Sequence, residues 1–169
     1  PCLAHGRPVA AILACMDADL SHPPEIIPRL VEVVVAGTAD IAIASRHVAG
    51  GGVVGDWPLR RRLYSRLATL LARGLTDVAD PLSGCFALRR AVVQPLKRAP
   101  RGYKICLEIL ARGTYATVAE IPYFFDDRSG GRSKMTFTTR TEFLLQLLDL
   151  YGSRLVGTAR RGRADGPAR

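Results

Sequence analysis

The sequence predicts an α/β protein built around a mainly parallel sheet. Short apolar runs at residues 9–16 and 39–46 are typical of buried strands, and amphipathic segments of helical length separate the strand-like runs. Strands that alternate with helices in this way form layered α/β domains. Ligands of such domains bind beyond the carboxyl ends of the strands, so a site is expected among the residues that follow each strand.

The first two predicted strands flank one helix. Residues 9–16, "VAAILACM", are apolar without a helical stripe and predict a buried strand. Pro23 and Pro24 then open a helix, because the first helical turn needs no amide donors, and this helix ends at Gly37. The alternating run "ADIAIASR", residues 39–46, predicts the second strand.

The middle of the chain combines a glycine-rich loop with a basic helix. The cluster "VAGGGVVGDWP" (48–58) predicts a flexible loop. Residues 59–74 interleave arginine and leucine at helical spacing, which gives one basic and one apolar face. The run "DPLSGCFALRR" (80–90) predicts a loop entering a short strand, and residues 90–99 predict a helix made irregular by Pro95.

The last third predicts two further helices around a strand. Residues 103–113 predict a helix, and residues 114–125 a strand with a proline near a sheet edge. A charged, glycine-containing loop follows at 126–135. An amphipathic helix is expected from about 136 to 155, and the composition of residues 156–169 predicts a basic disordered tail.

Composition narrows the classes of function. The chain has 169 residues, 48% of them hydrophobic, which suits one domain with a sizeable core. Its net charge of +9 favours anionic partners such as phosphates, nucleic acid or an anionic membrane. The four cysteines form no CxxC pair, so we expect reduced thiols rather than a zinc site. Aromatic residues are only 7% and no nucleic-acid-binding motif is present, so nucleic acid is not an expected partner.

Two carboxylates, Asp17 and Asp19, directly follow the first predicted strand. In an extended segment both side chains leave the same face and can converge on one cation. Oxygen ligands suit a hard divalent metal, and Mg²⁺ in particular keeps few protein ligands and shares the rest with substrate phosphates. The alternative is that one of these aspartates only caps the following helix.

Arginines provide the complementary positive charge. Arg46 ends the second predicted strand, and Arg60, Arg61 and Arg62 begin the basic helix. Guanidinium groups bind phosphate oxygens in bidentate fashion, so a second anion could be held beside the metal-bound one. The alternative for each of these arginines is a solvated helix face.

The loop "DRSGGRSKM" offers further cationic side chains on a glycine-softened backbone, namely Arg128, Arg132 and Lys134 beside Ser133. Glycines let the chain approach a ligand closely, and the cationic side chains could close over phosphates. From these residues alone, an ordinary basic surface turn is the preferred interpretation.

Read in order, six segments resemble the polyprenol-phosphate (dolichol-phosphate) mannosyltransferases of the family 2 glycosyltransferases. They cover residues 14–155 as several independent motifs: "DADLSHPPE", "SRHVAGGGVVGDWPLRRRLYSR", "DPLSGCFALRR", "GYKICLEILARG", "VAEIPYFFDDRSGGRSKM" and the amphipathic end. The resemblance implies a GT-A (Rossmann-like) fold over residues 1–155. The first nucleotide-binding strands and helices of that fold would be missing ahead of the acidic motif.

The resemblance also implies a reaction. The expected activity is inverting transfer of mannose from the nucleotide sugar GDP-mannose to a polyprenyl (dolichyl) monophosphate, with Mg²⁺ or Mn²⁺ as cofactor. A phosphate monoester is already largely dianionic at neutral pH, so the absence of an obvious catalytic histidine is no objection. The expected location is the cytoplasmic face of a membrane, reached peripherally through the helix at 136–155 and the arginine-rich tail.

Site residues are carried over from the resemblance by position. Asp17 and Asp19 match the acidic motif that holds the metal and the donor diphosphate, and Asp80 lies in the segment that lines the sugar side. The residues that match the acceptor-phosphate site are Arg46, Arg61 or its neighbour Arg60, and Ser65. The residues that match the mobile acceptor loop are Arg128, Ser133 and Lys134.

Two other readings stay open at this point. The first is a related family 2 transferase that moves another sugar, glucose or an N-acetylhexosamine, onto a polyprenyl phosphate. The second is a non-catalytic basic fragment that binds a membrane or nucleic acid. Metal-dependent binding that is lost on Asp19→Ala would distinguish the transferases from the basic fragment.

Overall fold

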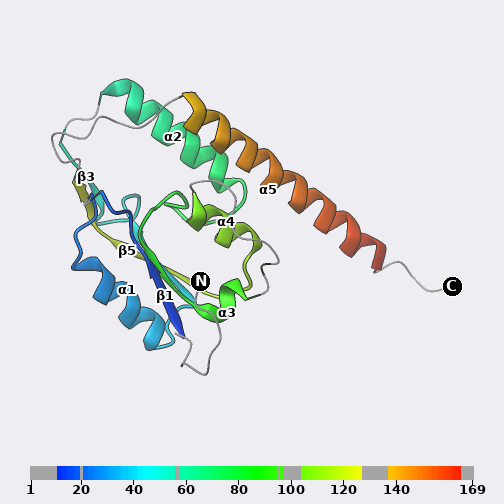
Figure 1. Cartoon of the computed structure of the whole chain (residues 1–169), viewed down its shortest axis with the longest axis horizontal. Helices are drawn as coiled ribbons and strands as arrows, with labels where there is room; N and C mark the ends of the chain where they lie inside the picture. The colour runs from blue at the N-terminus through cyan, green and yellow to red at the C-terminus, as the bar shows by residue number, and fades with distance from the viewer. Residues whose placement is uncertain are drawn as a thin grey trace.

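A computed structural model describes residues 11–19, 21–55, 58–94, 96, 104–126 and 137–164, with side chains of the last segment described from 139 to 155. Its centre is a four-stranded sheet in the order β1–β4–β2–β5 (Figure 1). The strands are β1 (Ile12–Cys15), β4 (Phe86–Arg89), β2 (Ile41–Ser45) and β5 (Val118–Pro122).

Three of these four strands run in the same direction. β4 is antiparallel to both of its neighbours, β1 and β2, whereas β5 is parallel to β2. The predicted α/β class with a mainly parallel sheet is therefore confirmed, with β4 as the one reversed strand. The sequence pattern of β4 carries no information on its direction, because a buried strand is apolar in either orientation.

The two faces of the sheet differ in the size of their side chains. On β2, Ile41 and Ile43 face a core cluster that includes Ile109 and Leu110 of α4 (Ile105–Arg112). The alternate β2 residues Ala42 and Ala44 face α1 (Ile26–Val35), whose buried residues are Ile26, Leu30 and Val34. The period of two along β2 thus places small side chains against α1 and large ones against α4.

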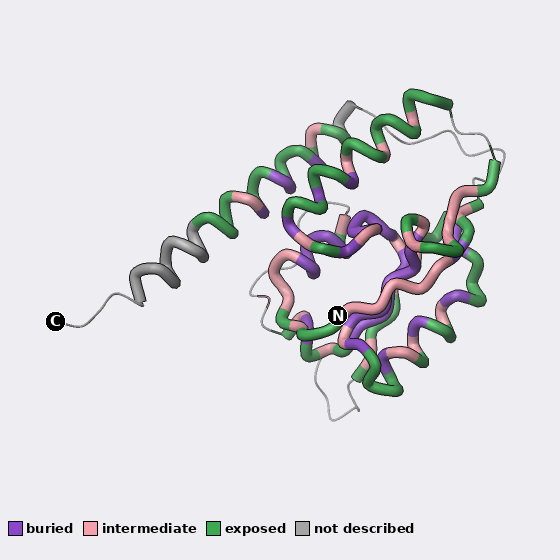
Figure 2. The backbone as a smooth tube through the Cα atoms, turned by 180° about the vertical axis from the view of Figure 1, so that it is seen from behind, coloured by how far each residue is buried: buried purple, intermediate pink, exposed green. Residues whose placement is uncertain are grey.

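A third core cluster joins two long helices to α4. α2 (Leu59–Arg73) and α5 (Phe137–Ala164) lie side by side (Figure 1), with Tyr151 Oη donating a hydrogen bond to the carbonyl oxygen of Leu71 at 2.6 Å. The buried members of this cluster are Ala72, Leu75, Leu82, Leu107, Phe143, Leu147 and Leu150. Figure 2 shows the opposite sides of both helices as exposed.

Several boundaries differ from the prediction. The predicted strand at 114–125 is two strands, β5 and β6 (Phe124–Asp126), and β6 pairs in parallel with β3 (Gly52–Val54). β3 lies inside the predicted glycine-rich loop, where two β-branched valines favour an extended backbone. The helix predicted at 90–99 is the short α3 (Arg90–Val93), since a proline follows two residues later.

The carboxyl-terminal helix is longer than predicted. α5 continues to Ala164, so residues 156–164, where the sequence predicted the start of a disordered basic tail, are helical. Arginine and alanine are among the best helix formers, which accounts for the extension. Among the described residues, no helix is both long and apolar enough to span a membrane.

Candidate functional site

A cleft of about 350 Å³ lies where β1 and β2 end and where α2, α4 and α5 approach the sheet. Its acidic and basic lining residues are Asp17, Asp19, His22, Arg46, Arg61 and Lys104. The remaining lining residues are Tyr64, Ser65, Ala68, Leu82, Gly84, Phe125, Thr139 and Phe143. The predicted position of a site beyond the carboxyl ends of the strands therefore corresponds to a real cleft.

Asp17 lies two residues beyond β1 and directly against Gly84. The β1–β4 pairing matches Cys15 with Phe86, and continuing this register sets Asp17 opposite Gly84. A Cβ at position 84 would collide with the Asp17 carboxylate, so glycine lets this carboxylate lie where it does. Contact with the His22 imidazole, whose Nε2 lies 3.7 Å from Oδ2, lowers the pKa of Asp17, and Lys104 contributes to this.

Asp19 is exposed, and its carboxylate folds back onto the backbone of the next residues. Its Oδ1 accepts a hydrogen bond from the backbone N–H of Ser21 at 3.0 Å. Helix α1 begins at Ile26 with Glu25 before it, and no side chain caps it, so neither aspartate plays the capping role weighed above. Asp17 and Asp19 keep exposed carboxylate oxygens at the cleft, as ligands of Mg²⁺ or Mn²⁺ require.

The donor set of the cleft suits a metal shared with a substrate. Over the described part of the chain, no group of three or more His, Cys, Asp or Glu side chains converges as a protein-only metal site would require. Mg²⁺ is commonly held by one or two carboxylates together with substrate phosphates and water. Asp17 and Asp19 provide such a pair, so the residues present fit this cofactor.

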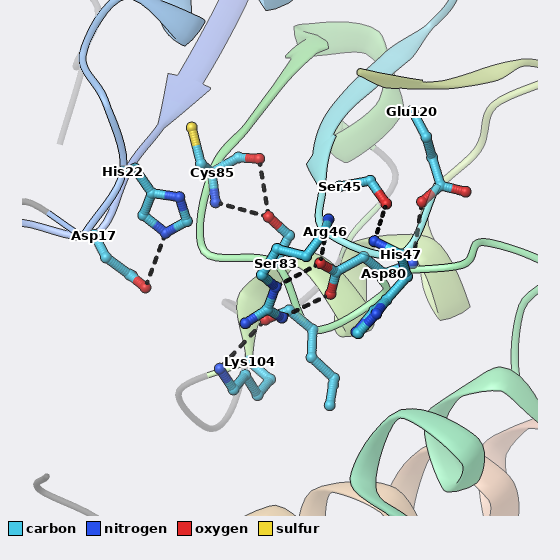
Figure 3. A network of polar contacts seen from close by, with 11 residues as sticks. Asp17, His22, Ser45, Arg46, His47, Asp80, Ser83, Cys85, Lys104 and Glu120 are labelled. Carbon is cyan, nitrogen blue, oxygen red and sulfur yellow. Dashed lines mark hydrogen bonds and ion pairs between the residues drawn. The ribbon is translucent and has the colours of Figure 1, made fainter. Parts of the chain in front are cut away.

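Arg46 and Asp80 form a buried ion pair behind the cleft (Figure 3). The Asp80 carboxylate is 0% exposed and accepts hydrogen bonds from Arg46 Nε at 2.8 Å, Nη2 at 2.9 Å and the backbone N–H at 3.0 Å. Burial alone would raise the pKa of Asp80, but the hydrogen bonds and charge of Arg46 outweigh it and lower that pKa. The Arg46 guanidinium also lies over the ring of Phe125, 5.4 Å from its centroid.

Asp80 therefore acts through Arg46 and does not line the cleft. Glu120 of β5 supports it, because its two carboxylate oxygens accept the backbone N–H groups of Ala79 and Asp80 at 2.8 and 3.0 Å. Of the predicted site residues, Asp80 is thus a positioning residue: it fixes the guanidinium of Arg46, and Arg46 is the member of the pair that faces the cleft.

Helix α2 brings two of the predicted acceptor-phosphate residues to the cleft. Arg61 and Ser65 are one helical turn apart on the same face, and both line the cleft. Arg60 is exposed and is not one of the lining residues that the structure describes, so Arg61 is the member of this pair that lines the cleft. Arg128, Ser133 and Lys134 of the predicted acceptor loop lie outside the described residues.

His22 and Lys104 line the cleft but were not among the predicted site residues. His22 is buried, stacks on Tyr123 at 5.2 Å between ring centroids and meets the edge of Phe125 at 5.7 Å. Lys104 lies directly before α4, where an N-cap residue is expected. The sequence offered a related signal, because Lys104 places a cation in the first turn of the helix predicted at 103–113, where positive charge is unfavourable. For His22 no local pattern existed, because its aromatic partners are a hundred residues away.

Comparisons with known proteins identify the family of this chain. Residues 3–96, more than half of the chain, match the family described as Glycosyl transferase family 2. The chain is 44% identical over 143 residues to a dolichol-phosphate mannosyltransferase of Pyrococcus furiosus, covering 82% of this chain and 40% of that protein. It is 37% identical over 147 residues to a dolichol-phosphate mannosyltransferase of Saccharomyces cerevisiae, covering 82% and 54%.

A third relative carries a related name. The chain is 36% identical over 146 residues to a polyprenol monophosphomannose synthase of Mycolicibacterium smegmatis, covering 82% of this chain and 54% of the relative. The chain therefore spans about half the length of the curated relatives it matches. The resemblance to polyprenol-phosphate mannosyltransferases is confirmed, as is the GT-A class of fold. The chain belongs to glycosyl transferase family 2.

Proposed function

We propose that this chain forms part of an inverting transferase that moves mannose from GDP-mannose to a polyprenyl monophosphate. The observation that carries the proposal is that two carboxylates, Asp17 and Asp19, share one cleft with the cationic Arg46 and Arg61. Such a cleft can hold two phosphate groups close together, one through a divalent cation and one through guanidinium groups. The names of the relatives support the choice of mannose and of a polyprenyl phosphate.

The proposed chemistry needs positioning more than proton transfer. A phosphate monoester has its second pKa near about 6 and is already a dianionic nucleophile at neutral pH. Arg46, held rigidly by Asp80, and Arg61 with Ser65 would orient this phosphate for in-line attack on the anomeric carbon. A divalent cation held by Asp17 and Asp19 would stabilise the negative charge of the leaving diphosphate.

We propose peripheral contact with the cytoplasmic face of a membrane, where a polyprenyl phosphate presents its head group. On α2, Leu59, Leu63, Leu67 and Leu70 are between 51% and 81% exposed and lie at helical spacing. On the adjacent α5, Leu144, Leu145, Leu148 and Leu155 are likewise exposed. Apolar stripes of this kind flanked by arginines are typical of helices that lie in a membrane interface.

The test is transfer of radiolabelled mannose from GDP-mannose to a short polyprenyl phosphate, with Mg²⁺ or Mn²⁺ and with chelator. The chain is assayed alone and joined to the amino-terminal half of the Pyrococcus furiosus relative. Asp19→Asn should reduce transfer by about 100-fold or more, since a metal ion supplies several kcal/mol and each 1.4 kcal/mol is about tenfold. Asp77→Asn, an exposed aspartate outside the cleft, is the matched control.

The outcomes separate the readings left open above. Transfer of mannose that requires metal and Asp19 supports the proposal. Transfer only when GDP-mannose is replaced by a glucose or N-acetylhexosamine nucleotide overturns the choice of sugar but keeps the transferase. No transfer from any nucleotide sugar, by a folded protein that binds DNA regardless of Asp19, would leave the basic fragment as the answer.

Replacing Gly84 with alanine is expected to weaken Mn²⁺ binding by about tenfold. The new methyl group would displace the Asp17 carboxylate, and shifting a ligand in this way typically costs about 10- to 100-fold in metal affinity. Titration of the protein with Mn²⁺ followed by electron paramagnetic resonance measures the change. Gly152→Ala is the control, because nothing lies near its added methyl group. Equal Mn²⁺ affinity in the two variants would contradict the role given to Asp17.

A further inference from the structure

Lys104 is a cation of the cleft to which neither the motifs nor the comparisons give a role. It immediately precedes α4 and lines the cleft together with Asp17 and Arg46. Its Nζ donates a hydrogen bond to the main-chain carbonyl oxygen of Leu82 at 3.3 Å (Figure 3). Leu82 belongs to the loop that follows Asp80, so this contact ties the start of α4 to the segment that positions Arg46.

The position is locally unfavourable for a lysine. The residue before a helix is preferably Ser, Thr, Asp or Asn, whose side-chain oxygen accepts a hydrogen bond from the first turn, and Lys104 makes no such bond. The amino terminus of a helix carries a partial positive charge, which repels an ammonium group. Both effects favour a hydrogen-bond acceptor or an anion at the place where this chain has a cation.

Burial adds a second cost, and neighbouring carboxylates offset it. Removal from water lowers the pKa of Lys104, whereas the charge of Asp17, and more weakly that of Asp80, raises it against the opposing charge of Arg46. The ammonium therefore depends on negative charge in and behind the cleft. Residues that break local rules are expected at functional sites, where a bound ligand can offset the local cost.

We infer that Lys104 binds a phosphate oxygen of a substrate in this cleft. The inference rests on the proposed function and adds a substrate-binding residue to it. With a phosphate beside it, the ammonium forms a charge-assisted hydrogen bond, and the positive end of α4 attracts the same anion. A bound phosphate thus supplies the negative charge that the helix terminus and the buried ammonium both favour. The phosphate could be the acceptor monophosphate or the donor diphosphate, and the experiment distinguishes them.

The experiment measures binding of two probes to the full chain by isothermal titration calorimetry. Farnesyl phosphate represents the acceptor monophosphate, and inorganic pyrophosphate with Mg²⁺ represents the donor diphosphate. Lys104→Met should weaken at least one of them by about tenfold or more, the loss expected for one charge-assisted hydrogen bond. A loss confined to farnesyl phosphate assigns Lys104 to the acceptor, and one confined to pyrophosphate assigns it to the donor.

Two further variants separate binding from structure. Lys104→Arg keeps the charge and should stay within about threefold of the wild type in the affected titration. Arg29→Met removes one positive charge from the exposed side of α1, outside the cleft, and should leave both titrations unchanged. Thermal unfolding gives the second readout: because the ammonium is costly where it lies, Lys104→Met should melt at the wild-type temperature or higher.

The results that overturn the inference differ from those that overturn the proposed function. Unchanged affinity for both probes in Lys104→Met, or no binding of either probe by the wild type, overturns it. So does a melting temperature lowered by several degrees in both Lys104 variants, which would indicate a structural role. Lys104-dependent phosphate binding by a chain that transfers no sugar, either alone or joined to the amino-terminal half of the relative, would uphold the inference and reject the transferase.

Discussion

Asp80→Asn is expected to lower the free energy of unfolding by about 3 kcal/mol. The substitution keeps the size of the side chain but leaves the Arg46 guanidinium, only 13% exposed, without its counter-charge. Breaking a buried ion pair from one side costs about 3–5 kcal/mol. The lower end applies because the amide oxygen of asparagine still accepts one of the hydrogen bonds. Urea denaturation measures the loss.

Two variants test whether the unpaired charge causes this loss. Asp77→Asn changes an exposed aspartate of the same loop and should stay within about 0.5 kcal/mol of the wild type. The double variant Arg46→Gln with Asp80→Asn replaces the ion pair by two neutral groups that can still hydrogen bond. It should regain most of the lost stability. A double variant as unstable as the single one would attribute the loss to packing instead.

The same ion pair gives the protein a sensitivity to acid. The pKa of Asp80 is lower in the folded protein than in the unfolded chain, so its contribution to stability is complete above the unfolded pKa of about 3.9. That contribution is lost as pH falls through the lower folded value. Between about pH 5 and pH 2, the wild type should therefore lose more stability than Asp80→Asn, which cannot protonate at this position.

Much of the site could be predicted because it follows local patterns. Asp17 and Asp19 come after an apolar strand, and Arg46 ends the next parallel strand, so the topology brings them to one edge of the sheet. Arg61 and Ser65 are spaced by one helical turn and reach the same cleft. The strand and helix periods of the sequence specify on which face or at which end of an element each of these side chains lies. The tertiary structure then only has to bring the elements together.

The remainder depends on contacts between distant residues. The ion pair of Asp80 with Arg46 joins residues 34 positions apart, so no window of sequence indicates that Asp80 is buried behind the cleft. The role of Gly84 becomes visible only when β4 lies antiparallel to β1 and opposes it to Asp17. The extension of α5 to Ala164 was missed for a different reason. The charge and glycine content of residues 156–164 indicated disorder, but the helix propensity of their arginines and alanines outweighed it.

Phe143→Ala is expected to cost about 3 kcal/mol of stability and to widen the cleft. Phe143 is 8% exposed, belongs to the cluster that anchors α5 against α2 and α4, and also forms part of the cleft wall. Truncation of a buried phenylalanine removes apolar contacts and leaves a cavity, at a typical cost of about 3–5 kcal/mol. Thermal and urea unfolding measure the cost. Binding of farnesyl phosphate measures the effect on the cleft.

Leu145→Ala is the matched control, because it lies two residues further along the same helix and is 65% exposed. Its stability should remain within about 0.5 kcal/mol of the wild type, since the side chain packs against little. Binding to vesicles of anionic phospholipid is a second measurement. Although its stability is unchanged, Leu145→Ala should bind these vesicles more weakly than the wild type if the exposed leucines of α5 enter a membrane interface. Equal losses of stability in Phe143→Ala and Leu145→Ala would mean that packing of Phe143 does not anchor α5 against α2 and α4. In that case α5 could not form a fixed wall of the cleft against which a substrate is held.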